Sequence, residues 1–158
     1  MKVILPGSYD PITVGHLDII KRASELYDEV YAVAFINPKK QYRFSADDRV
    51  RMLALATEEL DNVLVSYSDG LVIDYMREHG IHKIVKGYRN EVDLEYERVQ
   101  AEWNKAHGGY ETELIKCRDG FDLISSTRVR ETLDEGGELG ELLPPSVEAY
   151  IRSLRADR

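Results

Sequence analysis

The length, composition and charge of the chain exclude several classes of protein. Its 158 residues suffice for one domain with a buried core, and 43% hydrophobic with 32% charged residues is ordinary for a globular protein. A formal net charge of −8 argues against general binding to nucleic acid or to an anionic membrane. With one cysteine, Cys117, no signal-peptide pattern and no apolar run of membrane-spanning length, the sequence predicts a cytoplasmic protein without an intrachain disulfide.

Strand-like and helix-like patterns alternate along the chain. In order, they predict a strand at 2–5, a helix at 14–26, a buried strand at 29–36, a basic loop at 37–43, a helix that is capped by Ser45 and runs to about Glu59, and a strand at 62–66. The predicted order continues with a helix at 71–78, a strand at 83–86, a helix at 93–107, a strand at 111–117, a helix at 126–134, and a last helix from Pro145 to about Leu154.

This alternation predicts an α/β fold. Repeated strand–helix units with short apolar strands form parallel sheets, so we expect a single Rossmann-like domain over residues 1–158, with a five-stranded parallel sheet and helices on both faces. Ligands of such sheets bind beyond the carboxyl ends of the strands. Since the chain is acidic overall, the charge for a phosphate ligand must be local, and the candidates near turns are Lys39, Lys40, Arg43, Lys86 and Arg89.

The turn from Leu5 to His16 most clearly indicates a ligand. It joins the first strand to a helix whose opening turn carries Gly15 and His16. A helix N-terminus offers unpaired N–H groups and partial positive charge, which suit a phosphate. Gly15 lets a ligand approach the backbone, and His16 adds a donor that can be cationic there. The alternative, a plain turn with a surface histidine, stays open on these residues alone.

Several familiar motifs are missing from the sequence. There is no Gly-x-Gly-x-x-Gly after the first strand and no Gly-x-x-x-x-Gly-Lys-Ser/Thr, which disfavours dinucleotide oxidoreductases and P-loop enzymes. The four histidines and Cys117 lack zinc-ligand spacing, so we name no metal ligand. A Gly-x-Ser-x-Gly nucleophile elbow is also missing.

Short segments in a fixed order resemble a known family. They are Gly7-Ser8-Tyr9-Asp10-Pro11 with Thr13-Val14-Gly15-His16, Lys86-Gly87-Tyr88-Arg89, Asp93-Leu94-Glu95-Tyr96-Glu97 and Ile124-Ser125-Ser126-Thr127. Together they resemble the bacterial pantetheine-phosphate adenylyltransferases, nucleotidyltransferases with a [His/Thr]-x-Gly-His motif. The resemblance extends from Lys2 to about Leu154.

The resemblance implies a reaction and an assembly. The adenylyl group of ATP would pass to 4′-phosphopantetheine by direct in-line displacement, giving dephospho-coenzyme A and pyrophosphate in the penultimate step of coenzyme A synthesis. Mg²⁺ would accompany ATP, and the family assembles as a homohexamer, a dimer of trimers. Both the cation and the hexamer come from the resemblance alone.

The resemblance also assigns roles to individual residues. His16, Lys40 and Arg89 would be catalytic, and the acceptor would be bound by Ser8, Lys40, Leu71 and Lys86. Lys86 stands where we expect arginine, which keeps the charge but loses a bidentate fork. ATP would be bound by Ser8, Tyr9, His16, Gly87, Tyr88, Arg89, Glu97, Phe121, Asp122, Leu123, Ile124, Ser125, Ser126 and Thr127.

Other interpretations remain at this point. Ser125 or Ser126 could simply cap the following helix, and Tyr96 and Trp103 are more typical of a core or a subunit interface than of ligand contacts. The runner-up function is another cytidylyl- or adenylyltransferase, acting on nicotinamide mononucleotide or a sugar phosphate. A third possibility is a nucleotide-binding regulatory domain without turnover.

Overall fold

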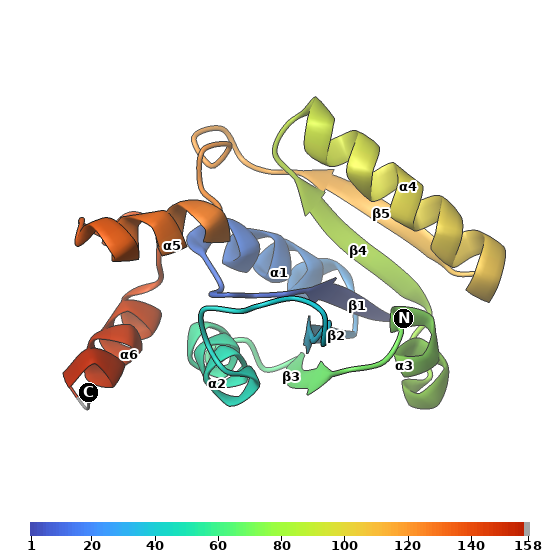
Figure 1. Cartoon of the computed structure of the whole chain (residues 1–158). Coiled ribbons are helices and arrows are strands. Elements are labelled where there is room, and N and C mark those ends of the chain that lie inside the picture. The colour runs from blue at the N-terminus through green and yellow to red at the C-terminus, as the bar shows by residue number, and fades with distance from the viewer. Residues whose placement is uncertain (157–158) are drawn as a thin grey trace.

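A five-stranded parallel sheet forms the centre of the molecule (Figure 1). The computed structural model describes residues 1–156. The strand order is β3-β2-β1-β4-β5, and all four pairings are parallel. The α/β prediction is therefore confirmed. The strands are β1 (Lys2–Gly7), β2 (Glu29–Phe35), β3 (Val63–Ser68), β4 (Lys83–Tyr88) and β5 (Glu111–Lys116).

Helices cover both faces of the sheet, as predicted. They are α1 (Val14–Leu26), α2 (Ala46–Thr57), α3 (Val72–His79), α4 (Glu91–Gly108), α5 (Ser126–Glu135) and α6 (Pro145–Ala156). Alternation along β1 sends Val3 and Leu5 into a core with α1, α2, α5 and α6, and sends Ile4 into a second core with α3. On the second face α4 packs on β4 and β5. Within residues 1–156 no helix is both long and apolar enough to cross a membrane.

Side-chain caps fix where the helices begin. Thr13, Ser45, Asn90 and Ser125 each accept a hydrogen bond from a backbone N–H in the first turn of α1, α2, α4 and α5. The predicted bounds of α1 are confirmed. The predicted start of α4 at residue 93 is two residues late, because Asn90 is the cap and Glu91 is already helical.

The two central strands part before they end. β1 pairs with β2 from Lys2 through Gly7, whereas it pairs with β4 only through Val3 and Ile4. This is the point where the strand order reverses, so an opening forms at the carboxyl edge. The Lys86 ammonium crosses the opening and donates to the Pro6 carbonyl at 3.1 Å.

Close packing holds β4 against α1 beside this opening. A Cβ on Gly87 would lie 2.8 Å from the Ile19 Cγ1 atom, closer than real side chains approach. Only glycine therefore fits between the flanking residues Lys86 and Tyr88 at this packing distance. Their backbone is thereby held beside the first turn of α1, where His16 lies.

Candidate active site

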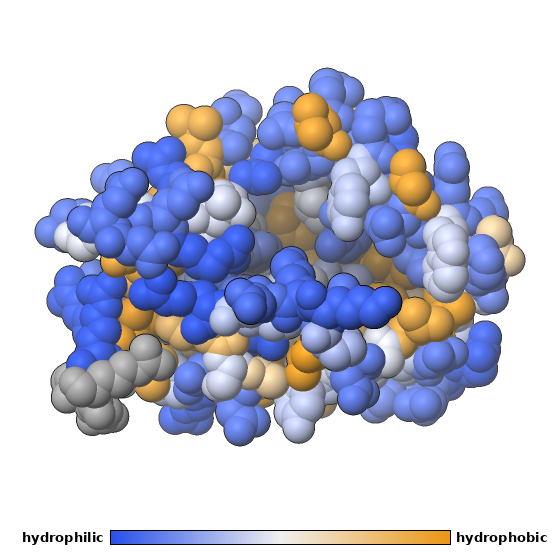
Figure 2. All heavy atoms as spheres, viewed as in Figure 1, coloured by the Kyte–Doolittle hydropathy of each residue, from blue (hydrophilic) through white to orange (hydrophobic). Residues whose placement is uncertain are grey.

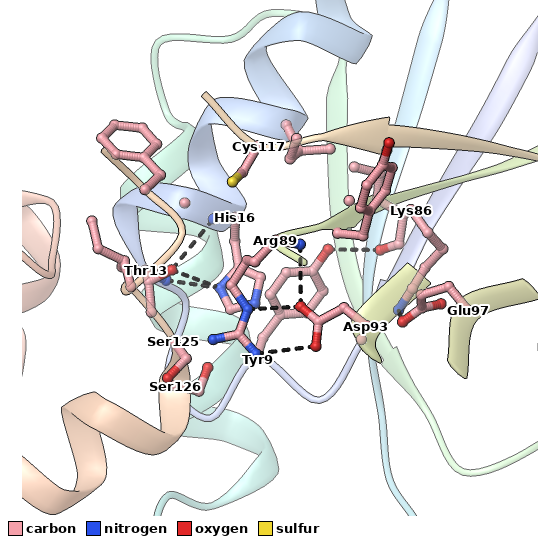
Figure 3. Close-up of a pocket in the computed structure, with 18 of the residues that line it drawn as sticks. Tyr9, Thr13, His16, Lys86, Arg89, Asp93, Glu97, Cys117, Ser125 and Ser126 are labelled. Atoms are coloured by element: carbon pink, nitrogen blue, oxygen red, sulfur yellow. Dashed lines mark hydrogen bonds and ion pairs between the residues drawn. The ribbon is translucent and has the colours of Figure 1, made fainter. Parts of the chain in front are cut away.

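Two hollows meet at the carboxyl edge of the sheet. The first has a volume of about 370 Å³ and lies over β1, β4 and the first turns of α1 and α5 (Figure 3). The second, of about 400 Å³, extends along α4 toward Phe35 and Val72. In Figure 2 the surface is hollowed near its centre, between α5 and α4, with a largely hydrophilic rim. The residues lining both hollows are Pro6, Gly7, Ser8, Lys86, Tyr96 and Glu97.

His16 lines the first hollow as a neutral imidazole. Its Nδ1 accepts from the Thr13 backbone N–H at 3.0 Å, so the proton of the neutral ring lies on Nε2. Burial, and then the charges of Lys86 and Arg89, lower the pKa of His16 to about 4. His16, which the sequence alone allows to be cationic, is therefore neutral near pH 7 in the free protein. The group available to a ligand is a neutral N–H donor.

This geometry predicts an unusual titration of His16. We expect its imidazole to titrate near pH 4 in the free protein, instead of near its ordinary 6.5. Because the folded pKa lies below the unfolded one, the contribution to stability is complete above pH 6.5 and is lost as the pH falls toward 4. NMR titration of the His16 ring, assigned with His16→Asn, measures it. A midpoint near 6.5 would show that the ring is not shielded.

Arg89 is held in a fixed orientation at the end of β4. Its Nε donates to Asp93 Oδ2 at 2.8 Å and its Nη2 to Asp93 Oδ1 at 3.3 Å (Figure 3). The Arg89 backbone N–H donates to the same carboxylate at 3.2 Å. Both residues line the first hollow only. The guanidinium keeps further N–H groups free for an anionic ligand.

Lys86 lies on the wall between the hollows. Besides the bond to Pro6, its ammonium forms an ion pair with Glu97 at 3.5 Å. Both side chains line both hollows. A single ammonium is therefore placed where ligands in the two hollows would meet.

A second lysine approaches the same wall from the loop after β2. The Lys40 ammonium donates to the Ser8 hydroxyl at 3.5 Å and lies 5.6 Å from the centre of the Tyr42 ring. Lys40 lines the second hollow, whereas its neighbour Lys39 lines neither. Arg43, another candidate cation, is paired with Asp134 instead.

The α5 N-terminus closes the first hollow on the opposite side. The question between the two serines is settled, since the Ser125 hydroxyl accepts from the Arg128 N–H at 3.1 Å and caps the helix. The Ser126 hydroxyl donates to the Pro11 carbonyl at 2.7 Å, which ties α5 to the turn after β1. Tyr9 of that turn is buried, donates to the Leu5 carbonyl at 2.8 Å and contacts the His16 ring edge-on.

Most of the residues expected at the ATP site come together. The first hollow is lined by Ser8, Tyr9, His16, Gly87, Tyr88, Arg89, Glu97, Phe121, Ile124, Ser125, Ser126 and Thr127, as well as Lys86. Asp122 and Leu123 are exposed and lie outside both hollows, because the turn before α5 brings Phe121 and Ile124 to the first hollow and leaves the two residues between them in solvent. Their assignment to the ATP site stays a prediction.

Leu71, which the resemblance assigns to the acceptor site, lies at the start of α3. It is the N-cap residue of α3, with 53% of its surface exposed, and it lines neither hollow. The next residue, Val72, lines the second hollow in its place. The contact of Leu71 with the acceptor stays a prediction, and Val72 is a further candidate from the same turn.

Three further residues line the hollows without having been expected at the site. Thr13 and Asp93 line the first hollow. The position of Asp93 four residues after Arg89 at a helix start was a usable signal for an ion pair. Tyr96 lines both hollows and is 64% exposed, and Trp103 is exposed as well, so of the two interpretations, core or subunit interface, the structure excludes the core for both.

The chemistry of the site is that of charge and hydrogen-bond donors. Cys117 lines the first hollow, but burial and the nearby Asp122 carboxylate raise the pKa of its thiol, which makes it a weak nucleophile. Cationic Lys40, Lys86 and Arg89, the neutral donor of His16 and a helix N-terminus surround the hollows. Such a set stabilises phosphate charge and suits transfer between two phosphates.

Comparison with known proteins agrees with this site. The family model described as cytidylyltransferase-like matches residues 4–132. The chain is 38% identical over 156 residues to a protein of Thermobifida fusca (strain YX) named phosphopantetheine adenylyltransferase, and the alignment covers 99% of this chain and 95% of that relative. The chain therefore belongs to the cytidylyltransferase-like nucleotidyltransferases, in the family of the phosphopantetheine adenylyltransferases.

Proposed function

We propose that this protein transfers the adenylyl group of ATP to 4′-phosphopantetheine and releases dephospho-coenzyme A and pyrophosphate. The observation that carries the proposal is the shared wall of the two hollows, where Ser8 and Lys86 face both. Two substrates in adjoining hollows would meet at this wall with their phosphates in contact. The name of the Thermobifida fusca relative supports the choice of acceptor.

In this proposal ATP occupies the first hollow. Arg89 binds its phosphates, and the α5 N-terminus with Ser126 and Thr127 lies on the opposite side of the hollow. The backbone of Gly87 and Tyr88, together with Phe121 and Ile124, frames the nucleotide.

The acceptor occupies the second hollow. Its pantetheine arm lies along the apolar side chains of Phe35 and Val72. Its phosphate is bound by Ser8, Lys40 and Lys86 at the shared wall. A lysine ammonium is a movable point charge, which suits a phosphate that changes position during reaction.

The reaction needs no protein nucleophile. The acceptor phosphate is already an anion, and its oxygen attacks the α-phosphorus in line while the bond to pyrophosphate breaks. His16 Nε2–H, Lys40 and Arg89 stabilise the charge that develops on the transferring group. Because His16 is neutral, it acts as a hydrogen-bond donor and does not supply a proton.

Mg²⁺ enters with ATP in this proposal. Residues 1–156 contain no group of three or more His, Cys, Asp or Glu side chains placed to hold a metal ion. The hollows' carboxylates Asp93 and Glu97 are already paired with cations. Phosphate oxygens and water therefore fit Mg²⁺ better than protein ligands do.

We also propose a homohexameric assembly, as in the family. Exposed apolar side chains follow the 4-3-4 spacing of a helix seam along α4: Val92, Tyr96, Val99 and Trp103. A subunit interface over this seam would bury it. The single domain over residues 1–158 and the cytoplasmic location likewise remain proposals.

A substrate screen tests the function. Purified protein is assayed for pyrophosphate release with ATP or CTP and with 4′-phosphopantetheine, nicotinamide mononucleotide or a sugar phosphate. We expect release only with ATP and 4′-phosphopantetheine together. Release with a different acceptor would favour another nucleotidyltransferase, and binding of ATP without release would favour a regulatory domain.

A further inference from the structure

Two carboxylates on α4 face the hollows one helical turn apart. Asp93 and Glu97, the α4 carboxylate pair, point from the same side of the helix. Each is bound to one cation from the end of β4, Asp93 to Arg89 and Glu97 to Lys86. Lys86 and Arg89 lie three residues apart, and each is thus within reach of one of two carboxylates that lie four residues apart on α4.

The two ion pairs occupy different places. Arg89 and Asp93 line the first hollow and are absent from the second. Lys86 and Glu97 line both and so stand at the shared wall. The carboxylate and the cation of each pair therefore face the same ligand space.

These two ion pairs are less exposed to solvent than an ordinary surface ion pair. The side chains of Lys86 and Glu97 are 26% and 14% exposed, and those of Arg89 and Asp93 are 35% and 28% exposed. On the same helix, the pair of Arg98 with Glu95 is 54% and 68% exposed. Partial burial strengthens the attraction within an ion pair and restricts the side chains that make it.

The pairs also solve an electrostatic problem. Lys86 and Arg89 are both close enough to His16 to lower its pKa. Two cations in one hollow repel each other and gain hydration by turning outward. A carboxylate behind each cation offsets the repulsion and holds the donor toward the hollow before any ligand arrives.

We propose that Asp93 and Glu97 are positioning residues that serve different substrates. Asp93 orients Arg89 toward ATP, and Glu97 holds Lys86 at the shared wall for the acceptor phosphate. The inference rests on the proposed function, since it assigns the two hollows to ATP and to 4′-phosphopantetheine. It gives Glu97 a role through Lys86 in place of the direct ATP contact expected from the sequence.

Steady-state kinetics with each substrate varied in turn test the division. Asp93→Asn keeps an acceptor for the Arg89 N–H but loses the charge, and should raise the KM for ATP by about tenfold, the equivalent of one charge-assisted hydrogen bond. Glu97→Gln should raise the KM for 4′-phosphopantetheine by a similar factor. In each variant the KM for the other substrate should change by less than about threefold. The charge-conserving variants Asp93→Glu and Glu97→Asp should give KM values between those of the unmodified protein and those of the amide variants.

Matched measurements separate this inference from a folding effect and from the function itself. Glu95→Gln breaks the exposed pair on the same helix and should leave both KM values unchanged. Calorimetric titration of ATP, which needs no turnover, should show weaker binding to Asp93→Asn and normal binding to Glu97→Gln. Absence of turnover in the unmodified protein would overturn the proposed function alone. Equal changes in ATP affinity for both variants, or none, would overturn the division between the carboxylates.

Discussion

Replacing His16 with alanine should reduce turnover on the order of 10²–10³-fold, the usual cost of losing one preorganised donor to a developing charge. The neutral Nε2–H faces the first hollow, and Nδ1 is fixed by the Thr13 N–H at 3.0 Å. Because the ring is already oriented, the donor needs no reorganisation during reaction. The measurement is kcat with both substrates saturating.

The fold must be followed in the same experiment, since His16 belongs to the capping box of α1. Losing a cap costs about 1 kcal/mol, which circular dichroism and thermal unfolding will detect. His107, stacked on Trp103 outside both hollows, gives the matched control His107→Ala with normal turnover. Near-normal kcat for a folded His16→Ala protein would remove His16 from the mechanism.

The second large effect is a separation of the two substrates by mutation. Arg89→Ala should weaken ATP binding by about 10- to 100-fold and affect 4′-phosphopantetheine little, because Arg89 lines only the first hollow. Lys40→Ala should do the reverse, since Lys40 lines only the second. Calorimetric titration of each ligand into each variant measures both.

Neighbouring side chains supply the controls for this separation. Lys39→Ala removes the same charge one residue away, outside both hollows, and should change neither affinity. Arg98→Ala is the matching control for Arg89→Ala. It removes an arginine charge on the solvent side of α4 and should change neither affinity. If Arg89→Ala and Lys40→Ala weakened both ligands equally, the assignment of one substrate to each hollow would be wrong.

The sequence predicted the helices and strands well, because caps, glycine stops and apolar spacing act within a few residues of the chain. The cap at Thr13 and the apolar spacing that follows fix α1, and Gly80 ends α3 in the left-handed region with φ 65°. The missed start of α4 follows from Asn90, whose side chain caps a turn that lies ahead of the apolar pattern. The five-strand order itself follows from long-range pairing, which no single segment encodes.

The site was harder to predict, since orientation and environment depend on the fold. The charge state of His16 depends on burial and on Lys86 and Arg89, which lie about 70 residues further along the chain. Val72 lines the second hollow and its neighbour Leu71 does not, a difference that depends on how the turn before α3 is oriented. Motif spacing located the segments that line the hollows, and packing decided which side chains enter them.

The identity of the product tests the central claim most directly. Purified protein is incubated with ATP and 4′-phosphopantetheine, and mass spectrometry and a pyrophosphate assay follow the same reaction. We predict an acceptor that gains one adenylyl group, with one pyrophosphate released per product and no adenylylated protein. An unmodified acceptor, release of phosphate in place of pyrophosphate, or a protein that carries the adenylyl group would contradict direct transfer across the shared wall.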